Sequence, residues 1–172
     1  LGNRVLWGRK MTYFVRLVIG TIRTVPSVLF GVIFVIAFGL GKAAGAVAVA
    51  FYTTGYLAKL FYEAFEAVDP DVIEAVRSTG CSRLQLFRYA IIPEAAHAII
   101  SQLLFMFEYN IRASTIMGFV GAGGIGYYML GYIQMLQYRH LLTTFLVTLA
   151  VVMLIDLISG RIRSKIHERG NK

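Results

Sequence analysis

The segment Glu74-Ala-Val-Arg-Ser-Thr-Gly80, with Pro93 thirteen residues after Gly80, decides how the rest of the chain is interpreted. It belongs to a polar stretch, residues 66–92, that separates two long apolar stretches. The hydrocarbon of a bilayer offers no partners to charged or hydrogen-bonding groups, so such a segment has to lie in water. We therefore expect a loop outside the membrane, where another protein can contact it.

The composition on both sides of this segment is that of a membrane protein. Hydrophobic residues make up 58% of the 172 residues, charged residues only 15%, and the mean hydropathy is +0.68. A soluble domain carries about 25% charged residues. The sequence thus predicts an all-α membrane protein that forms a single transmembrane domain over residues 1–172.

Four apolar stretches are close to the roughly 20 residues that a helix needs to cross the hydrocarbon. The predicted spans are residues 24–41, 43–63, 93–118 and 139–158. The polar loop, residues 66–92, is predicted to hold two short helices separated by a turn at residues 79–82. Asp69 suits the cap of the first helix and Pro70 its first position. The tyrosine-rich residues 127–138 predict a short interfacial helix.

Basic residues give the chain a net charge of +8, and they cluster at residues 1–23, 77–88 and 161–172. These clusters fall on one side of a four-span topology, which the positive-inside rule places in the cytoplasm. Both ends of the chain are then expected in the cytoplasm. A nucleic-acid-binding surface would instead gather basic residues on one element of a folded domain. The basic N-terminal segment fits a membrane interface or, alternatively, a solvated helix.

The polar loop resembles the cytoplasmic coupling loop of the permease subunits of bacterial ABC importers. Their pattern is Glu-Ala-Ala, three residues, Gly, nine residues and Ile-x-Leu-Pro. The matching residues are Glu74, Ala75, Gly80 and Pro93. The departures, each apolar for apolar, are Val76, Ala90 and Ile92. The resemblance implies that this segment, including Arg83, docks on a separate ATPase subunit.

Further strings resemble the permeases of phosphonate importers, over roughly residues 24–165. They are Gly39-Leu-Gly41, Tyr52-Thr-Thr-Gly55, Ala75-x-Arg77-x-Thr79-Gly80, Phe107-Glu-x-Asn-x-Arg112 and Val120-Gly-Ala-Gly-Gly-Ile-Gly126. The resemblance implies import of phosphonate or a related oxyanion such as phosphite through the bacterial inner membrane. It also implies a homodimer of permeases, a periplasmic binding protein and no cofactor. A permease of the methionine type is the alternative within the family. Permeases of this kind usually carry a further N-terminal span, so we expect the chain to be truncated.

The glycine-rich loop contains Gly121, Gly123, Gly124 and Gly126. It lacks the preceding strand of a dinucleotide site and the Gly-Lys-Ser/Thr of an ATPase loop. The chain is therefore expected to hydrolyse no ATP. Glycines allow irregular backbone to pack tightly where it lines a cavity, which suggests a gate; a plain flexible turn is the alternative.

Polar residues inside the apolar spans are the candidates for a substrate path. Glu108 and Arg112 lie four residues apart with Asn110 between them, and buried charges of this kind face a cavity or each other. The pair either fixes helix packing or, with Arg112 facing the dimer axis, attracts an anion. Thr53 and Thr54 either line a pore or bond to a helix.

The sequence shows no catalytic or metal-binding set. His97 and His140 are isolated, and Cys81 is the only cysteine. A membrane enzyme would need an intramembrane catalytic set. A channel or structural membrane protein would not need the Glu-Ala…Gly…Pro loop, and it remains the alternative outside the family.

Overall fold

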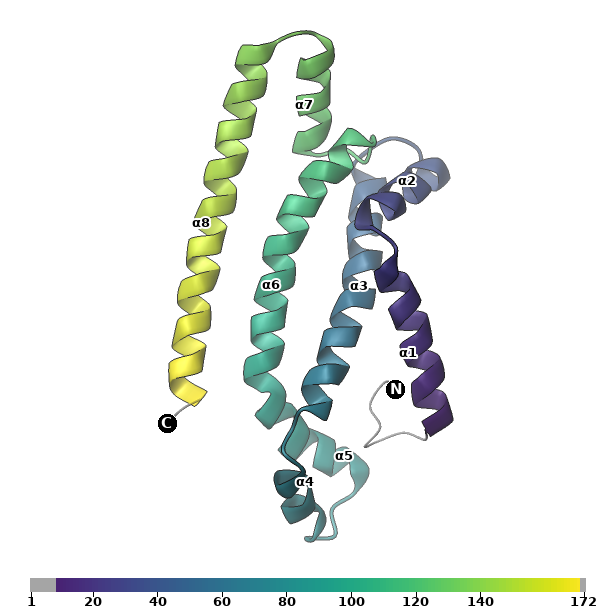
Figure 1. The fold of residues 1–172 in the computed structure, drawn as a ribbon, viewed down its shortest axis with the longest axis vertical. Helices are drawn as coiled ribbons and strands as arrows, with labels where there is room; N and C mark the ends of the chain where they lie inside the picture. The colour runs from purple at the N-terminus through teal and green to yellow at the C-terminus, as the bar shows by residue number, and fades with distance from the viewer. Residues whose placement is uncertain (1–8, 171–172) are drawn as a thin grey trace.

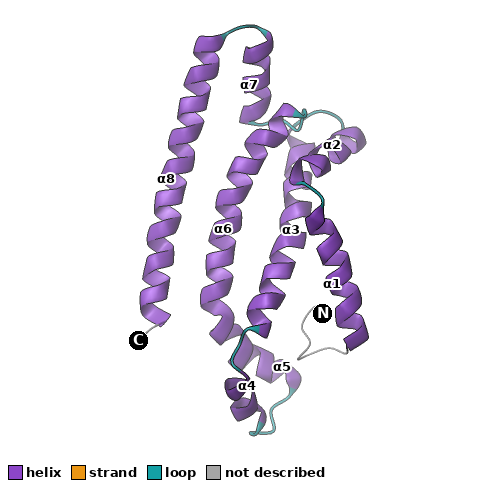
Figure 2. Cartoon of the chain, viewed as in Figure 1, coloured by secondary structure: helices purple, strands orange, loops and turns teal. Residues whose placement is uncertain are grey.

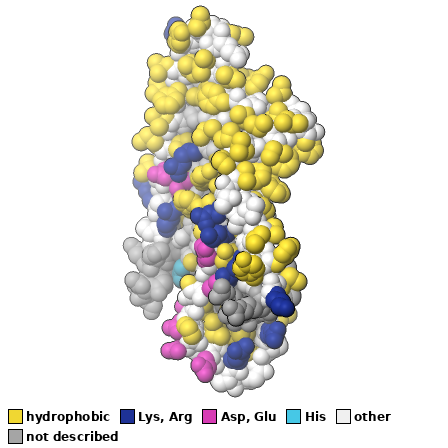
Figure 3. Space-filling model, turned by 45° about the vertical axis from the view of Figure 1, so that its right-hand side comes forward, with side chains coloured by type: hydrophobic (Ala, Val, Ile, Leu, Met, Phe, Trp, Pro, Cys, Tyr) yellow, Lys and Arg dark blue, Asp and Glu magenta, His cyan; other side chains and the backbone are white. Residues whose placement is uncertain are grey.

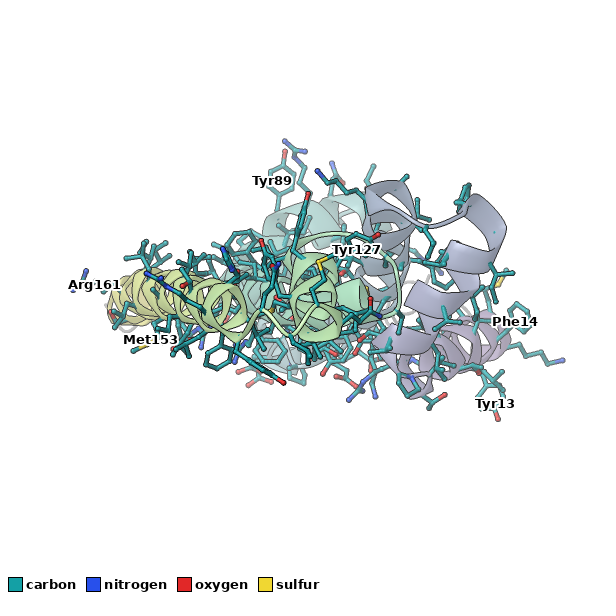
Figure 4. All side chains as sticks on the ribbon, turned by 90° about the horizontal axis from the view of Figure 1, so that it is seen from above. Tyr13, Phe14, Tyr89, Tyr127, Met153 and Arg161 are labelled. Atoms are coloured by element: carbon teal, nitrogen blue, oxygen red, sulfur yellow. The ribbon has the colours of Figure 1, made fainter. Side chains whose placement is uncertain are left out.

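A computed structural model describes residues 9–170, and for residue 9 and residues 165–170 the backbone only. The terminal basic residues Arg4 and Lys172 lie outside the described residues. Every regular element in the described part is a helix, and the longest helices stand side by side along the molecule (Figure 1). Seen from above, Tyr13 and Phe14 point outward at one end of the molecule, and Met153 and Arg161 lie at the other (Figure 4).

Within the described residues, three long helices are apolar enough to cross a membrane. α3 (Lys42–Glu66) corresponds to the second predicted span, and α6 (Ile92–Phe119) corresponds to the third. α8 (Tyr138–Gly170) begins where the fourth was expected but continues well beyond residue 158. α6 packs between α3 and α8, so these three helices form the frame of the molecule.

The first predicted span, residues 24–41, is wrong as a single helix. The chain forms α1 (Arg9–Thr24) and α2 (Ser27–Phe38), which meet at an angle of 87°. Pro26 causes the break, because proline lacks an amide donor and disfavours helical backbone in the residue before it. α2 has 12 residues and is about 18 Å long, too short to cross the hydrocarbon alone. Together the bent pair has the length and composition of a fourth span.

α1 is held against α3 by its basic residues. Arg16 forms an ion pair with Glu66, and its guanidinium lies 4.5 Å from the ring centre of Tyr62. Arg23 lies over the ring of Tyr56 at 4.9 Å. Helix α1 is therefore packed against α3, a contact that neither interpretation of the basic N-terminal segment anticipated.

The apolar core of the frame lies where α2, α3 and α6 meet. Its fully or nearly buried members are Phe30, Ala48, Tyr52, Met106, Met117 and Ala122. Small residues of α3 allow this close packing, because a small side chain lets neighbouring backbones approach. At this level the rings of Tyr52 and Tyr109 stack with their centres 5.7 Å apart.

The polar loop folds as predicted into two short helices, α4 (Pro70–Arg77) and α5 (Arg83–Leu86). Asp69 caps α4 by accepting a hydrogen bond from the backbone amide of Asp71 at 2.9 Å. Ser82 and Gln85 form a capping box at the start of α5. Both helices lie at one end of the molecule, beyond the lower ends of α3 and α6 (Figure 2).

Pro93 lies in the first turn of α6, where the third span was predicted to begin, and helical backbone also precedes it. A π-helical turn, η1 (Phe87–Ile91), joins α5 to α6, and the amide of Ile92 donates to the carbonyl of Phe87. Proline offers no amide to the carbonyl of residue 89 and its ring crowds that carbonyl. The wider turn just before Pro93 accommodates both effects.

α7 (Ile125–Gln134) is the short helix expected near residues 127–138. It packs on both α6 and α8 at the end of the molecule opposite α4 and α5. Figure 3 shows that hydrophobic side chains cover the upper part of the molecule, whereas lysine, arginine and carboxylate side chains gather over its lower half.

Candidate functional site

The α4–α5 segment presents the predicted coupling residues at the surface. Glu74 and Ala75 are exposed on α4, and Arg83 is exposed at the first position of α5. The backbone amide of Gly80 donates to the carbonyl of Arg77 at 3.1 Å and closes the turn between the helices. Pro93, also exposed, lies just after the π-helical turn. The five residues therefore belong to one contiguous unit rather than to separate loops.

Gly80 has a backbone φ of +76°, as its place in the turn suggested. Side chains rarely adopt this left-handed region, whereas glycine does so without steric cost. A Cβ at this position would meet no other atom within 4 Å. The requirement for glycine is therefore a matter of backbone conformation and not of space.

A small apolar cluster supports α4 and α5 from beneath. Its buried members are Ala64, Val68, Leu86, Ala90, Ile91 and Ala95. Val72, Ile73 and Val76 of α4 pack against this cluster, as does Cys81. Since α4 turns its apolar side inward and its polar side outward, the segment is a fixed platform on the ends of α3 and α6.

The glycine-rich loop is clamped between helices. The amide of Gly41 donates to the carbonyl of Gly121 at 3.0 Å, which ties the α2–α3 connection to the loop. A Cβ on Gly123 would lie 2.8 Å from the backbone nitrogen of Lys42, and one on Gly126 would collide with the carbonyl oxygen of Thr115. Gly124 shares the left-handed conformation, with φ at +79°. These contacts do not fit a freely flexible turn.

An open groove of about 380 Å³ runs between α3 and α6 and ends at this loop. Most of its wall is apolar, with Val49, Phe107 and Ile111 among the contributors. Its polar groups come from Lys42, Asn110 and Ser114. A second hollow of about 260 Å³ lies beside the loop, and Lys42, Tyr127 and Tyr128 contribute to it.

Thr53 and Asn110 are brought together at the α3–α6 contact. The hydroxyl of Thr53 donates to Oδ1 of Asn110 at 3.0 Å. Thr54 instead donates to the carbonyl of Ala50 in its own helix at 2.8 Å. Of these two threonines, Thr53 is thus the one joined to a residue that lines the groove.

Glu108 is nearly buried and joins two helices through one carboxylate. Its Oε1 accepts from Nη2 of Arg163 on α8 at 3.2 Å, and its Oε2 lies 3.7 Å from Nη2 of Arg112. Nε of Arg112 also donates to the backbone carbonyl of Glu108 at 3.4 Å. The expected pair with Arg112 is present, but the shorter contact is with Arg163.

The polar candidates on α6 therefore divide into two groups. Residues two apart lie about 200° from each other around a helix, so Asn110 and Arg112 occupy nearly opposite faces. Asn110 lines the groove, whereas Arg112 lines a narrow crevice together with Val152 and Asp156 of α8. Sequence reasoning missed Arg163 and Lys42. Arg163 contacts Glu108, and Lys42 lines the groove, only because helices far apart in the sequence pack together.

Comparison with known proteins places these features in a family. The sequence profile of the family described as "Binding-protein-dependent transport system inner membrane component" matches residues 1–169. A phosphite transport system permease protein of Stutzerimonas stutzeri is 38% identical over 148 residues, which cover 86% of this chain and 54% of that protein. A phosphate-import permease protein of Mycolicibacterium smegmatis is 39% identical over 145 residues, 84% of this chain and 27% of that protein. The chain spans about half of the first relative and less of the second.

A shorter relative is covered almost completely. A putative cryptic phosphonate transport system permease protein of Escherichia coli K12 is 38% identical over 112 residues, 65% of this chain and 92% of that protein. Among solved structures, an inward-facing MetNI methionine ABC transporter has a TM-score of 0.80 at 23% identity, covering 94% of this chain and 78% of that one. That likeness concerns the fold. The profile and the relatives together show that this chain belongs to the family of inner membrane components of binding-protein-dependent transport systems.

Proposed function

We propose that this chain forms the translocation path of an ABC importer for phosphite, a phosphonate or a related phosphorus oxyanion. The observation that carries the proposal is the identity of 38–39% with permeases named for phosphite, phosphate and phosphonate transport. The Phe-Glu-x-Asn-x-Arg string at residues 107–112 supports the same substrate class. ATP hydrolysis is assigned to a separate subunit, and the chain itself acts as a transport component.

In this proposal α4 and α5 dock on the ATPase. Glu74, Ala75 and Arg83 supply the exposed contact surface, and Gly80 sets the angle between the two short helices. Because the platform is packed on α3 and α6, its displacement is passed directly to the helices that line the groove. Rigid-body motion of packed elements is a common means of coupling two sites.

The groove between α3 and α6 is proposed as this chain's share of the substrate path. Asn110 lines it and is held by the hydrogen bond from Thr53. The clamped loop of Gly121, Gly123, Gly124 and Gly126 closes its end as a gate. Glu108 and Arg112 are then assigned to helix packing, because their contacts run toward α8. The role of Thr54 is limited to its own helix.

The complete transporter is proposed to contain two copies of the permease, two ATPase subunits and a periplasmic binding protein in a bacterial inner membrane. The basic residues near α4, α5 and the end of α8 support a cytoplasmic position for that end of the molecule. The glycine loop and α7 then face the periplasm, from which a binding protein delivers its ligand.

Methionine is the second candidate substrate, because the MetNI transporter shares the fold. Uptake by proteoliposomes that contain the full-length permease, its ATPase and its binding protein tests both. We expect ATP-dependent uptake of phosphite or methylphosphonate and none of methionine. ATP-dependent uptake of methionine without uptake of either phosphorus compound would overturn the proposal. Omission of the binding protein is the matched control.

A further inference from the structure

We infer that Lys42 is the cation that draws the oxyanion into the groove and makes the groove selective for anions. The inference rests on the proposed function and adds a specificity-determining residue to it. Lys42 is the first residue of α3. It lines the groove between α3 and α6, which Asn110 also lines. Lys42 also lines the smaller hollow beside the glycine loop, to which Tyr127 and Tyr128 contribute. A substrate that passes the glycine loop therefore meets this side chain from either direction.

The charge distribution leaves Lys42 without a neutralising carboxylate. Residues 24–62 and 109–155, which include α2, most of α3, the glycine loop and α7, contain no aspartate or glutamate. Lys42 makes no ion pair with any residue that the structure describes. Lys59 lies further down the same helix and pairs with Glu63 at 3.3 Å. Lys42 is exposed at the end of the groove. Its unpaired ammonium attracts anions in the surrounding water over roughly a Debye length.

The electrostatics of the helix end do not favour a lysine at this position. A helix N-terminus carries a partial positive charge, so a cation in the first turn is electrostatically disfavoured. The first turn of α3 contains no acidic residue that would offset this effect. At the same time the backbone of Lys42 is held in place, because Gly123 packs on it and Gly41 bonds to Gly121. The backbone of Lys42 is thus held, while its exposed side chain carries an unpaired charge at a helix position that does not favour a cation. An anionic ligand explains this arrangement better than helix stability does.

Asn110 supplies a second group suited to an oxyanion. Its Oδ1 accepts from Thr53, which leaves the amide hydrogens as the groups it can offer to the groove. Ser114 already donates its hydroxyl proton to the carbonyl of Ile111 at 2.9 Å. The oxygens of phosphite and phosphonates that have lost their protons only accept hydrogen bonds. A cation near the loop and an amide donor further along α6 match that requirement.

The test is phosphite uptake by the reconstituted full transporter with Lys42→Gln, Lys42→Arg and, as the matched control, Lys59→Gln. We expect Lys42→Gln to lower the initial uptake rate about tenfold at low ionic strength. Lys42→Arg and Lys59→Gln should stay within about twofold of wild type, since both keep the cation in the groove. Salt of about 0.5 M should reduce the difference between wild type and Lys42→Gln, because it screens the ammonium. The melting temperature of Lys42→Gln should equal or exceed that of the wild type.

Each other outcome overturns the inference in a recognisable way. If the wild type takes up phosphite and Lys42→Gln does so equally fast, the inference fails and the proposed function stands. A lowered melting temperature in Lys42→Gln, or a stable but inactive Lys42→Arg, would assign Lys42 a structural role. If the wild type takes up no phosphorus oxyanion, the proposed function is wrong, and the role of Lys42 that rests on it is wrong as well.

Discussion

At the scale of single residues, the Glu108 carboxylate joins α6 to α8 by an ion pair. It accepts from Arg163 on α8 while lying beside Arg112 on its own helix. We predict that a double-mutant cycle with Glu108→Gln and Arg163→Gln gives a coupling energy of about 1–2 kcal/mol in unfolding free energy. Glu108→Gln keeps the shape of the side chain and removes its charge, whereas Arg163→Gln shortens the side chain and removes the guanidinium. The cycle subtracts these separate effects and leaves the interaction between the two residues.

The matched control for that cycle is the pair Lys59–Glu63 within α3, whose members are more exposed than Glu108. An i,i+4 pair of this kind is worth about 0.3–0.5 kcal/mol. Reversible unfolding of the purified protein in detergent would supply both numbers. Equal coupling in the two cycles would mean that Glu108 does not hold α8 in place.

Gly126 gives a second prediction at this scale. Its Cβ would collide with the carbonyl oxygen of Thr115, a backbone atom that cannot move alone. We expect Gly126→Val to prevent α7 from packing on α6 and to leave little folded protein in the membrane. Gly131→Ala, in the same helix but with nothing within 4 Å, should fold at least as well as wild type. Equal amounts of the two variants after detergent extraction would refute this packing account.

Sequence reasoning succeeded for residues whose role depends on neighbours in the chain. The cap at Asp69 and the turn between the two short helices follow from local backbone chemistry and are confirmed. The partner of Glu108 could not be predicted in the same way. α7 displaces α8 along its axis, so the position of Arg163 depends on the length and packing of that short helix.

At the scale of elements, the π-helical turn sets the rotation of α5 about the axis of α6. Pro93→Ala restores an amide donor at residue 93, so the turn can relax to a regular α-helix. The π-helical turn holds one residue more than an α-helical turn. Its relaxation to an α-helix therefore rotates α5 by about 100° relative to α6. We predict a folded permease with less uptake per ATP hydrolysed. Parallel measurements of uptake and hydrolysis would check this, and an unchanged ratio would show that the turn has no part in coupling.

The helices themselves were largely predictable, and the exception has a clear cause. Long apolar stretches correspond to α3 and α6 within a few residues. The predicted span 24–41 is not one continuous helix, because Pro26 separates α1 from α2. The basic residues of α1 suggested an interfacial or solvated segment. Arg16 and Arg23 instead contact residues of α3 and hold the two helices together. Hydropathy alone does not detect such contacts.

At the scale of the whole molecule, the charge distribution predicts the orientation in the membrane. α4, α5 and the end of α8 should face the cytoplasm, and the glycine loop and α7 should face the periplasm. In a Cys81→Ser background, Tyr132→Cys should react with an impermeant thiol reagent from outside intact cells. Ser78→Cys and Ser164→Cys should react only after the membrane is opened. Labelling of all three from outside would contradict the topology.

In the proposed function, a separate subunit hydrolyses ATP and acts through α4 and α5 to drive phosphorus oxyanions along this chain. The most direct test of this proposal measures ATP hydrolysis and phosphite uptake in the same vesicles for wild type, Gly80→Ala and Gly80→Val. The account predicts that both activities occur in wild type. Gly80→Val should keep hydrolysis but lose uptake, because a β-branched residue cannot adopt φ near +76° without strain. Gly80→Ala should be intermediate. ATP-driven uptake at the wild-type rate in Gly80→Val would contradict the account.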